Sequence, residues 1–195
     1  MSSIYNSIID TILNKIIPET KISISKGNKV FGAAILNKTD LSKIVIGTNN
    51  ETLNPLFHGE ISAINEYYKI NELNKLKPQD CIFLSTHEPC SMCLSAITWS
   101  GFDNFYYFFP YEDTKNKFDI PHDLNILSKI FNINNGNYNH SNDYWESHSI
   151  LNEIDILPNK DKKALHEKID EILNIYNDFS KLYQLSKLEN KIPLN

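Results

Sequence analysis

The chain has 195 residues, of which 41% are hydrophobic and 22% charged, and a formal net charge of −5. These values fit one globular domain, with or without an appendage, and the lack of any apolar run of about 18 residues argues against a membrane span. All 19 basic side chains are lysines, so the sequence lacks the arginine-rich basic stripe typical of proteins that bind a polynucleotide. A small substrate is therefore favoured over a nucleic acid.

A helix and a hairpin are predicted at the beginning of the chain. Isoleucines recur at helical spacing over residues 3–17, and Pro18 is expected to end this helix. Because Asp10 lies inside the segment and no basic residues precede it, we interpret it as a helix of the fold rather than a secretion signal. The β-branched runs 30–36 and 43–47, separated by a polar turn, predict an antiparallel hairpin.

Helices and strands are predicted to alternate through the middle of the chain. Apolar spacing and turn residues predict a helix from Gly59, a strand over 81–85, a helix over 91–100 that stops at Gly101, and a strand over 105–109. This places His58 and Cys90 each at the start of a helix.

The last third of the chain predicts a loop, a helix, a strand and a helical extension. We expect a polar loop over 110–120, a helix with Pro121 at its first position that runs to Phe131, and a surface loop over 132–143. A fifth strand is predicted over 144–151. An amphipathic stripe over 160–189 predicts one long helix or a helix pair.

This order of elements predicts an α/β fold, a three-layer α-β-α sandwich. Its five-stranded mixed sheet has an antiparallel first hairpin, the other strands are parallel, and helices cover both faces. We expect a catalytic domain over 1–157. The C-terminal helical extension over 158–195 is expected to pack on it or to lie at a dimer interface.

Three cysteines are present, and two of them belong to one Cys-x-x-Cys motif. An odd number of cysteines favours a reducing compartment, so we expect a cytoplasmic protein. Cys81 is left over, and we interpret it as a buried apolar side chain in a strand.

Two short motifs carry the chemistry: His58-Gly59-Glu60 and Pro89-Cys90-Ser91-Met92-Cys93. Together they read H-x-E and P-C-x-x-C, the signature of zinc-dependent deaminases. Zinc favours nitrogen and sulfur ligands, and three ligands without a fourth indicate a catalytic rather than a structural ion. Cys-x-x-Cys alone could also be a redox pair or half of a structural zinc site, but neither alternative explains the histidine and the glutamate.

From about Phe31 to Phe109 the chain resembles the cytidine deaminase-like superfamily. The resemblance implies that His58, Cys90 and Cys93 bind one zinc ion per chain. It also implies that Glu60 is catalytic. A zinc-bound hydroxide would attack an amidine-type ring carbon, and Glu60 would shuttle protons until ammonia leaves.

Within this superfamily, the run from Glu88 to Trp99 looks most like the guanine deaminase and tRNA adenosine deaminase branch. A helix between the fourth and fifth strands points the same way, because it allows those strands to run parallel. One departure from the family is Gly59, where much of the family has alanine or another small residue, and we expect this difference to matter little. The candidate substrate contacts are Asn49, Phe57, Glu88, Trp99 and Glu146.

Several of these candidates have a simpler interpretation. Asn49 lies in a Gly-Thr-Asn loop that resembles a substrate-binding loop of the family, but it could be a turn residue. Phe57 could stack on a base or act as a hydrophobic staple of the next helix. A polar cluster follows the predicted strand over 105–109 and consists of Glu112, Asp113, Asp119, His122 and Asp123. A carboxylate among them could accept a hydrogen bond from a purine N–H group, or the cluster could be solvated.

The leading functional hypothesis is a zinc hydrolase that releases ammonia from a free base such as guanine, from cytosine, or from a nucleoside such as cytidine. The partner is then a small molecule, and we expect a homodimer. A tRNA-specific adenosine deaminase is the first alternative, although it needs a basic groove. The second alternative is a non-catalytic zinc-containing binding module or partner subunit.

Overall fold

The computed structural model describes residues 2–194 and is organised around one mixed sheet with the strand order β2-β1-β3-β4-β5. The strands are β1 (Gly32–Asn37), β2 (Lys43–Thr48), β3 (Cys81–His87), β4 (Asn104–Phe109) and β5 (Glu146–Ser149). The helices are α1 (Ser2–Thr11), α2 (Ile17–Ile24), α3 (Gly59–Tyr68), α4 (Ser91–Trp99), α5 (Tyr111–Asn116), α6 (His122–Phe131), α7 (Ile150–Asp155) and α8 (Asn159–Ser186). Single helical turns are η1 (Ile12–Ile16), η2 (Pro78–Asp80) and η3 (Asn134–Gly136).

Strand directions agree with the predicted mixed sheet. β1 is antiparallel to both β2 and β3, whereas β3, β4 and β5 run parallel. The parallel pairing of β4 with β5 follows from the helices between them, since a parallel neighbour needs a crossover connection. Because β2 and β3 point the same way on either side of β1, the loops after their carboxyl ends meet at one edge of the sheet.

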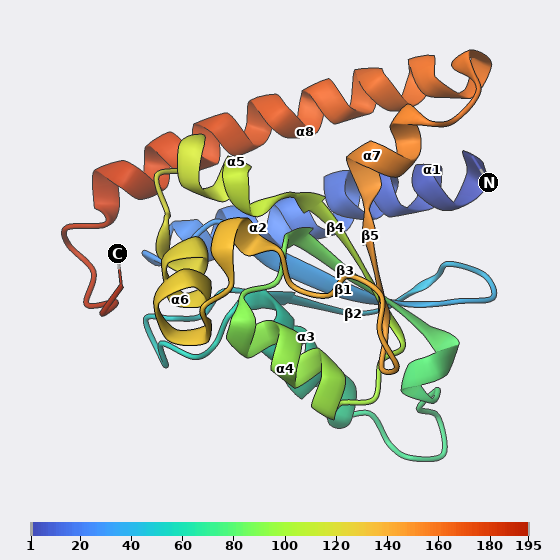
Figure 1. Ribbon diagram of the computed structural model, residues 1–195, viewed down its shortest axis with the longest axis horizontal. Coiled ribbons are helices and arrows are strands. Elements are labelled where there is room, and N and C mark those ends of the chain that lie inside the picture. Colours follow the sequence, from blue (N-terminus) through green and yellow to red (C-terminus); the bar gives the residue numbers. More distant parts are fainter. Residues whose placement is uncertain (1, 195) are drawn as a thin grey trace.

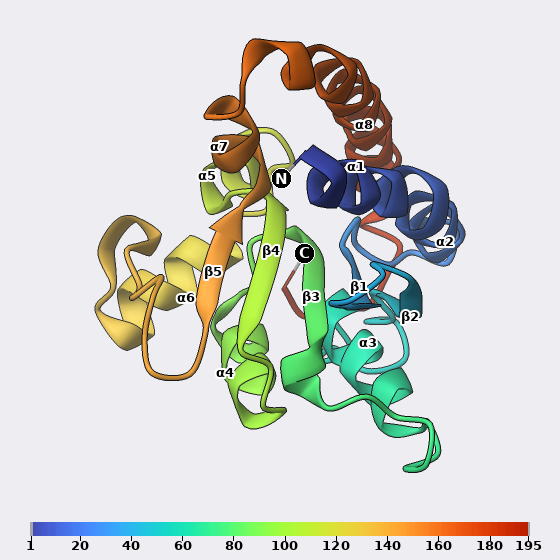
Figure 2. The same ribbon diagram turned by 90° about the vertical axis from the view of Figure 1, so that its right-hand side faces the viewer.

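Alternating side chains divide the core between the two faces of the sheet. In β1, Ala33 and Ile35 pack with α3 and α4, whereas Ala34 and Leu36 pack with the helices of the opposite face. Figure 1 shows α3 and α4 below the sheet and α1, α7 and α8 above it. Figure 2 shows the same separation from the side. The three-layer sandwich predicted from the sequence is confirmed.

The N-terminal helix does not end at Pro18, contrary to the prediction. The turn η1 is a π-helix in which the Ile17 N–H donates to the carbonyl of Ile12, and Pro18 then lies in the first turn of α2. The wider turn shifts the hydrogen-bond register just before the proline, whose missing N–H is tolerated at a helix start. Ile12 and Ile16 stay buried through the turn, so burial of this apolar stripe keeps the chain helical.

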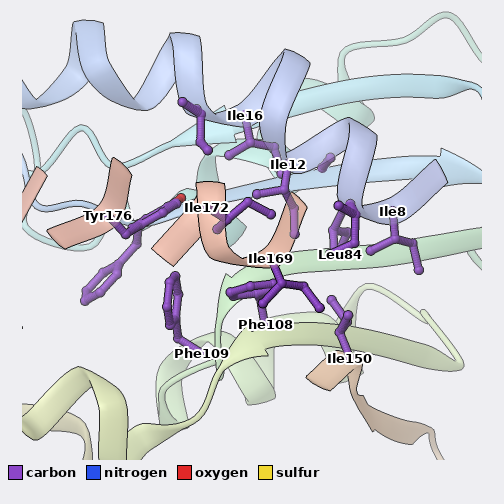
Figure 3. Packing of buried hydrophobic residues seen from close by; sticks show 14 of the residues in the cluster. Ile8, Ile12, Ile16, Leu84, Phe108, Phe109, Ile150, Ile169, Ile172 and Tyr176 are labelled. Carbon is purple, nitrogen blue, oxygen red and sulfur yellow. The ribbon is translucent and has the colours of Figure 1, made fainter. Parts of the chain in front are cut away.

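The C-terminal helix α8 is one helix rather than a pair, and it shares the main core. Figure 3 shows Ile169 and Ile172 of α8 packed with Ile12, Leu84 and Phe108. Full burial of such a side chain contributes about 1.5–3 kcal/mol, so the extension stabilises the sheet face that it covers. No helix within residues 2–194 is long and apolar enough to cross a lipid bilayer. The domain boundary at 157/158 and the dimer stay predictions.

Residues 110–120 are not the irregular loop that was predicted, because they contain the short helix α5. Pro110 precedes the helix, Glu112 and Asp113 lie in its first turn, and Lys115 lies in its last turn. This order of charges complements the helix dipole and explains why a polar segment folds into a helix. The next helix, α6, begins after Pro121 rather than at it.

A partly buried acid, Glu153, joins the first helix to the end of the sheet and makes the stability depend on pH. Glu153 accepts hydrogen bonds from Tyr5 Oη at 2.8 Å and from His148 Nδ1 at 2.7 Å. Burial raises the pKa of Glu153, but these hydrogen bonds bring it below its ordinary value of 4.5. The stabilisation is therefore present above about pH 4.5 and is lost as the pH falls through the lowered pKa.

We expect Glu153→Gln to lower the free energy of unfolding by about 1 kcal/mol at neutral pH, since the group is partly exposed. Over a range from about pH 7 to about pH 3, the difference from the wild type should hold down to about pH 4.5 and then shrink, because the wild-type carboxylate is protonated only as the pH falls through its lowered pKa. Denaturant unfolding across this range measures it. A difference that stays constant with pH would contradict the assignment.

Candidate active site and metal centre

The metal-ligand candidates lie at the two loop-to-helix junctions beyond the carboxyl ends of β2 and β3. His58 is the N-cap residue of α3 and Cys90 that of α4, both with extended backbone, and Cys93 lies in the first turn of α4. The structure thus brings together residues from segments more than thirty positions apart in the sequence. Helix N-termini favour negative charge, so they support thiolate ligands.

The spacing of these three side chains fits a tetrahedral zinc ion. His58 Nδ1 lies 3.6 Å from Cys90 Sγ and 3.7 Å from Cys93 Sγ. Bonds of about 2.3 Å to sulfur and about 2.0–2.1 Å to nitrogen in a tetrahedron would place these atoms about 3.5–3.6 Å apart. All three cysteines are free thiols, so Cys90 and Cys93 are not bridged to each other. The nitrogen and sulfur donor set is the one that zinc prefers.

The pKa values of the three ligand side chains and of Glu60 depend on one another, because these groups lie close together. The thiol of Cys93 and the imidazole of His58 hold the pKa of Cys90 well below its usual range, although burial opposes them. Burial and the negative charge on Cys90 raise the pKa of Cys93 and that of Glu60. Burial lowers the pKa of His58, but Cys90 and the nearby carboxylates raise it to about 9. A bound dication would relieve this crowding of negative charge and ionise both thiols.

Glu60 points into the site and is not free in solvent. It is buried, with 4% of its surface exposed. Its Oε1 accepts a hydrogen bond from Ser85 Oγ at 3.0 Å, and its Oε2 accepts one from Cys93 Sγ at 3.3 Å. Its carboxylate therefore lies beside the metal ligands, held by a strand residue on one side.

A cavity of about 220 Å³ opens beside the metal ligands. Apolar side chains make up most of its wall, among them Phe31, Leu56, Met92 and Ile120. The C-terminal residues 192–194 also line it, a contact that no sequence pattern indicated. The cavity is smaller than the roughly 300–1,000 Å³ typical of pockets for drug-sized ligands, which suits a single flat ring system.

Of the predicted polar cluster, only part reaches the cavity. His122 and Asp123 line its wall. Asp113 instead forms an ion pair with Lys117 at 3.0 Å, one turn along the chain. Burial and the negative charge on Cys90 raise the pKa of Asp123 well above its usual range. Asp123 is thus the carboxyl of the cluster that lines the cavity, beside His122.

The buried ion pair of Lys29 and Glu51 lies on the same wall and was missed by the sequence analysis. Lys29 Nζ lies 2.8 Å from Glu51 Oε1, and the two side chains are 6% and 1% exposed. Glu51 falls in a polar loop that resembled an ordinary turn, and Lys29 directly precedes a strand. Nothing in their spacing signals that they meet.

Three predicted substrate contacts lie close to the metal ligands but not on the cavity wall. Asn49 is buried: its Nδ2 donates to Glu51 Oε2 at 2.8 Å, and its Oδ1 accepts the Gly59 N–H at 2.7 Å. Glu88 accepts hydrogen bonds from the Tyr111 N–H and the Tyr138 hydroxyl, and burial raises its pKa to about 7. Phe57 lines a neighbouring polar groove with Asn49. Asn49 and Glu88 thus hold the loops around the site in place.

The structure does not bring Trp99 and Glu146 to the site. Trp99 ends α4, at the opposite end from Cys90, and its side chain is 91% exposed. Glu146 opens β5 and pairs with Asn104, the first residue of β4, so it lies at the edge of the sheet away from the carboxyl ends. They therefore do not lie among the residues around the cavity, and their role as substrate contacts stays a prediction.

Gly59 matters for the packing of α3 against β1, more than the family resemblance led us to expect. A Cβ atom there would lie 2.8 Å from Gly32 Cα and 3.1 Å from the Gly32 carbonyl carbon. The start of α3 packs against the backbone of β1 at this point, with no room for a side chain. This close approach positions His58 and Glu60 on either side of Gly59.

We expect Gly59→Ala to destabilise the protein by about 1–3 kcal/mol, the usual cost of overpacking, even though alanine favours helix formation by up to about 1 kcal/mol. Displacement of His58 should also weaken zinc binding. Denaturant unfolding and metal analysis measure both effects, with Ser62→Ala one turn later in α3 as the control. A variant as stable as the wild type would show that the backbones of α3 and β1 can move apart without loss of stability.

Comparisons with known proteins bear on this site. The model of the cytidine and deoxycytidylate deaminase zinc-binding region matches residues 8–109. A tRNA-specific adenosine deaminase from Rickettsia bellii is 34% identical over 97 residues, which is 49% of this chain and 66% of the relative. The guanine deaminase of Bacillus subtilis is 40% identical over 72 residues, 36% of this chain and 44% of the relative. The chain thus spans less than two thirds of the length of these relatives.

A solved structure supports the fold over a longer stretch. The guanine deaminase from Nitrosomonas europaea superposes with a TM-score of 0.54 at 15% identity, covering 85% of this chain and 81% of that one. At this identity the likeness concerns the fold alone.

Proposed function

The chain belongs to the cytidine and deoxycytidylate deaminase zinc-binding family, and from this premise we propose that it deaminates a small aminated heterocycle, with free guanine as the first candidate. The observation that carries the proposal is the cavity of about 220 Å³ beside His58 and Cys90. Its size suits one base. Its largely apolar wall suits a flat aromatic ring, which would lie with one edge towards the metal ligands.

We propose that Glu60 is the catalytic acid and base. When bound, zinc supplies a Lewis acid that lowers the pKa of a water ligand. Glu60 lies beside Cys93 and is fixed by Ser85, so it can take a proton from the nucleophile. The same carboxyl can then give this proton to a ring nitrogen, take the second proton from the hydroxyl group added to the ring carbon, and pass it to the departing amine, so that ammonia leaves and a carbonyl remains. Burial raises the pKa of Glu60, which suits a group that must take up a proton and give it back.

Asp123 is the proposed substrate-orienting residue. It lines the cavity with His58, and its pKa is raised, which favours the neutral carboxyl. A neutral carboxyl carries one donor and an acceptor oxygen, so it can bind a ring edge that presents an acceptor and a donor side by side. Guanine and related bases have such edges, which supports a purine over an apolar ring.

A tRNA adenosine deaminase is the alternative, because such enzymes are among the relatives. Extraction of a base from a folded RNA needs an open, basic rim for the phosphates. Here the net charge is −5 and arginine is lacking, while Pro193 and Leu194 occupy part of the cavity wall. These features favour a free base or nucleoside.

The test is release of ammonia from a panel of substrates by the zinc-loaded protein. The panel holds guanine, adenine, cytosine, guanosine, cytidine and a tRNA carrying adenosine in its anticodon loop, and mass spectrometry identifies each product. We expect guanine, or another free base or nucleoside of the panel, to be converted fastest. Conversion of the tRNA alone would replace the proposal with the alternative. Zinc binding without conversion of any member would favour the non-catalytic module.

A further inference from the structure

The buried ion pair on the cavity wall contacts the side of the zinc-ligand histidine that faces away from the other ligands. Glu51 Oε1 lies 3.7 Å from His58 Nε2 and 2.8 Å from Lys29 Nζ. His58 Nδ1 is the nitrogen that faces the two sulfurs. A shift of about half an ångström would bring Nε2 and Oε1 to the roughly 3.2 Å upper limit of an N–H···O hydrogen bond.

The same network holds the backbone next to this histidine. Glu51 Oε2 accepts the Lys29 N–H at 3.2 Å and Asn49 Nδ2 at 2.8 Å. Asn49 Oδ1 in turn accepts the N–H of Gly59, the residue after His58. Glu51 is therefore fixed from three directions, and its remaining side faces the imidazole.

We propose that Glu51, paired with Lys29, is a positioning residue that holds His58 with Nδ1 towards the metal and so raises zinc affinity. A carboxylate that accepts the second N–H of a ligand histidine fixes its tautomer and ring orientation and makes it a better donor to the metal. A carboxylate this deeply buried needs a partner charge, and Lys29 supplies it. The inference rests on the metal site, not on which base is the substrate.

An ion pair with a purely structural role would affect stability and zinc affinity together, whereas the proposed role of Glu51 separates them. Removing one charge from a buried pair leaves the other uncompensated, so Lys29→Met or Glu51→Gln alone lowers stability whether or not Glu51 acts on His58. Removing both charges restores neutrality. The double variant therefore separates the two roles, because stability can recover while the acceptor for His58 stays weakened.

The experiment measures zinc affinity by competition with a chelator of known affinity, alongside the melting temperature of the metal-free protein. Glu51→Gln and the double variant Lys29→Met with Glu51→Gln are compared with the wild type. The control is the pair Lys38→Met with Asp103→Asn, which breaks a partly exposed ion pair of 2.7 Å away from the metal ligands. This control should keep wild-type zinc affinity.

We expect Glu51→Gln to weaken zinc binding about 10–100-fold, the usual effect of losing such an outer partner. The double variant should recover most of the melting temperature and still bind zinc about 10–100-fold more weakly than the wild type. Zinc affinity that recovers together with stability would overturn the proposal, and so would wild-type affinity in Glu51→Gln. Neither outcome would touch the proposed deaminase activity, which the substrate panel tests separately.

Discussion

Glu60→Gln should lower the rate of deamination by about 10²–10⁴-fold, the usual contribution of a general acid or base. Glutamine keeps the size of the side chain, and its Oε1 can still accept a hydrogen bond from Ser85 Oγ. It cannot take up and return a proton, so the chemical step is lost while the fold stays. Zinc content should remain at one ion per chain, since Glu60 lies beside the ligand group without belonging to it.

Steady-state kinetics on the best substrate of the panel measure this effect, with metal analysis of the same samples. Glu66→Gln is the matched control, because Glu66 lies on the same helix but faces solvent, with a side chain 51% exposed. Its rate should equal that of the wild type. A Glu60→Gln variant that retains more than about a tenth of the wild-type rate would remove this residue from the chemistry.

Cys93→Ala should abolish stable zinc binding and, with it, turnover. Loss of one of three protein ligands leaves only His58 and Cys90, too few to hold the ion against competing water and chelators. The buried thiol is replaced by a smaller apolar group, so the metal-free fold should survive. Added zinc should no longer raise the melting temperature, because a ligand stabilises a protein only when it binds the folded state.

Cys81→Ala is the control for this variant, since it removes a buried thiol from β3, the strand that precedes α4 in the chain. Cys81 Sγ lies 3.3 Å from the Lys77 carbonyl, and Cys81 is not part of the metal-ligand group. Burial raises the pKa of Cys81 to about 11, as expected for an inert thiol. This variant should bind zinc normally and lose only modest stability. Full zinc content in Cys93→Ala would mean that the ion is held by other residues.

Packing changed several local expectations along the chain. Pro18 was expected to end the first helix, yet a π-turn and the burial of Ile12 and Ile16 carry the helix through it. Segment 110–120 was expected to be irregular because it is polar, but its charges follow the helix dipole. Both errors come from local rules that a hydrophobic stripe or an ordered run of charges can override.

The sequence by itself determined the layered α/β fold and the zinc-ligand motif. Alternating patterns report which faces are buried, and Cys90 and Cys93 sit within one helical turn, so short-range geometry already aligns them. His58 could be joined to them because the family motif pairs the two segments.

Only the tertiary structure decided what surrounds the metal ligands. Lys29, Glu51, Asp123 and residues 192–194 meet at one cavity although they are far apart in the chain. Trp99, six residues after Cys93, lies away from it because a helix carries successive turns about 5.4 Å further along its axis. Distance along the chain does not set distance in space once crossovers and a long C-terminal helix return the chain to the same edge of the sheet. The pairing of Lys29 with Glu51 is decided at this edge, because a buried charge without a partner would cost stability.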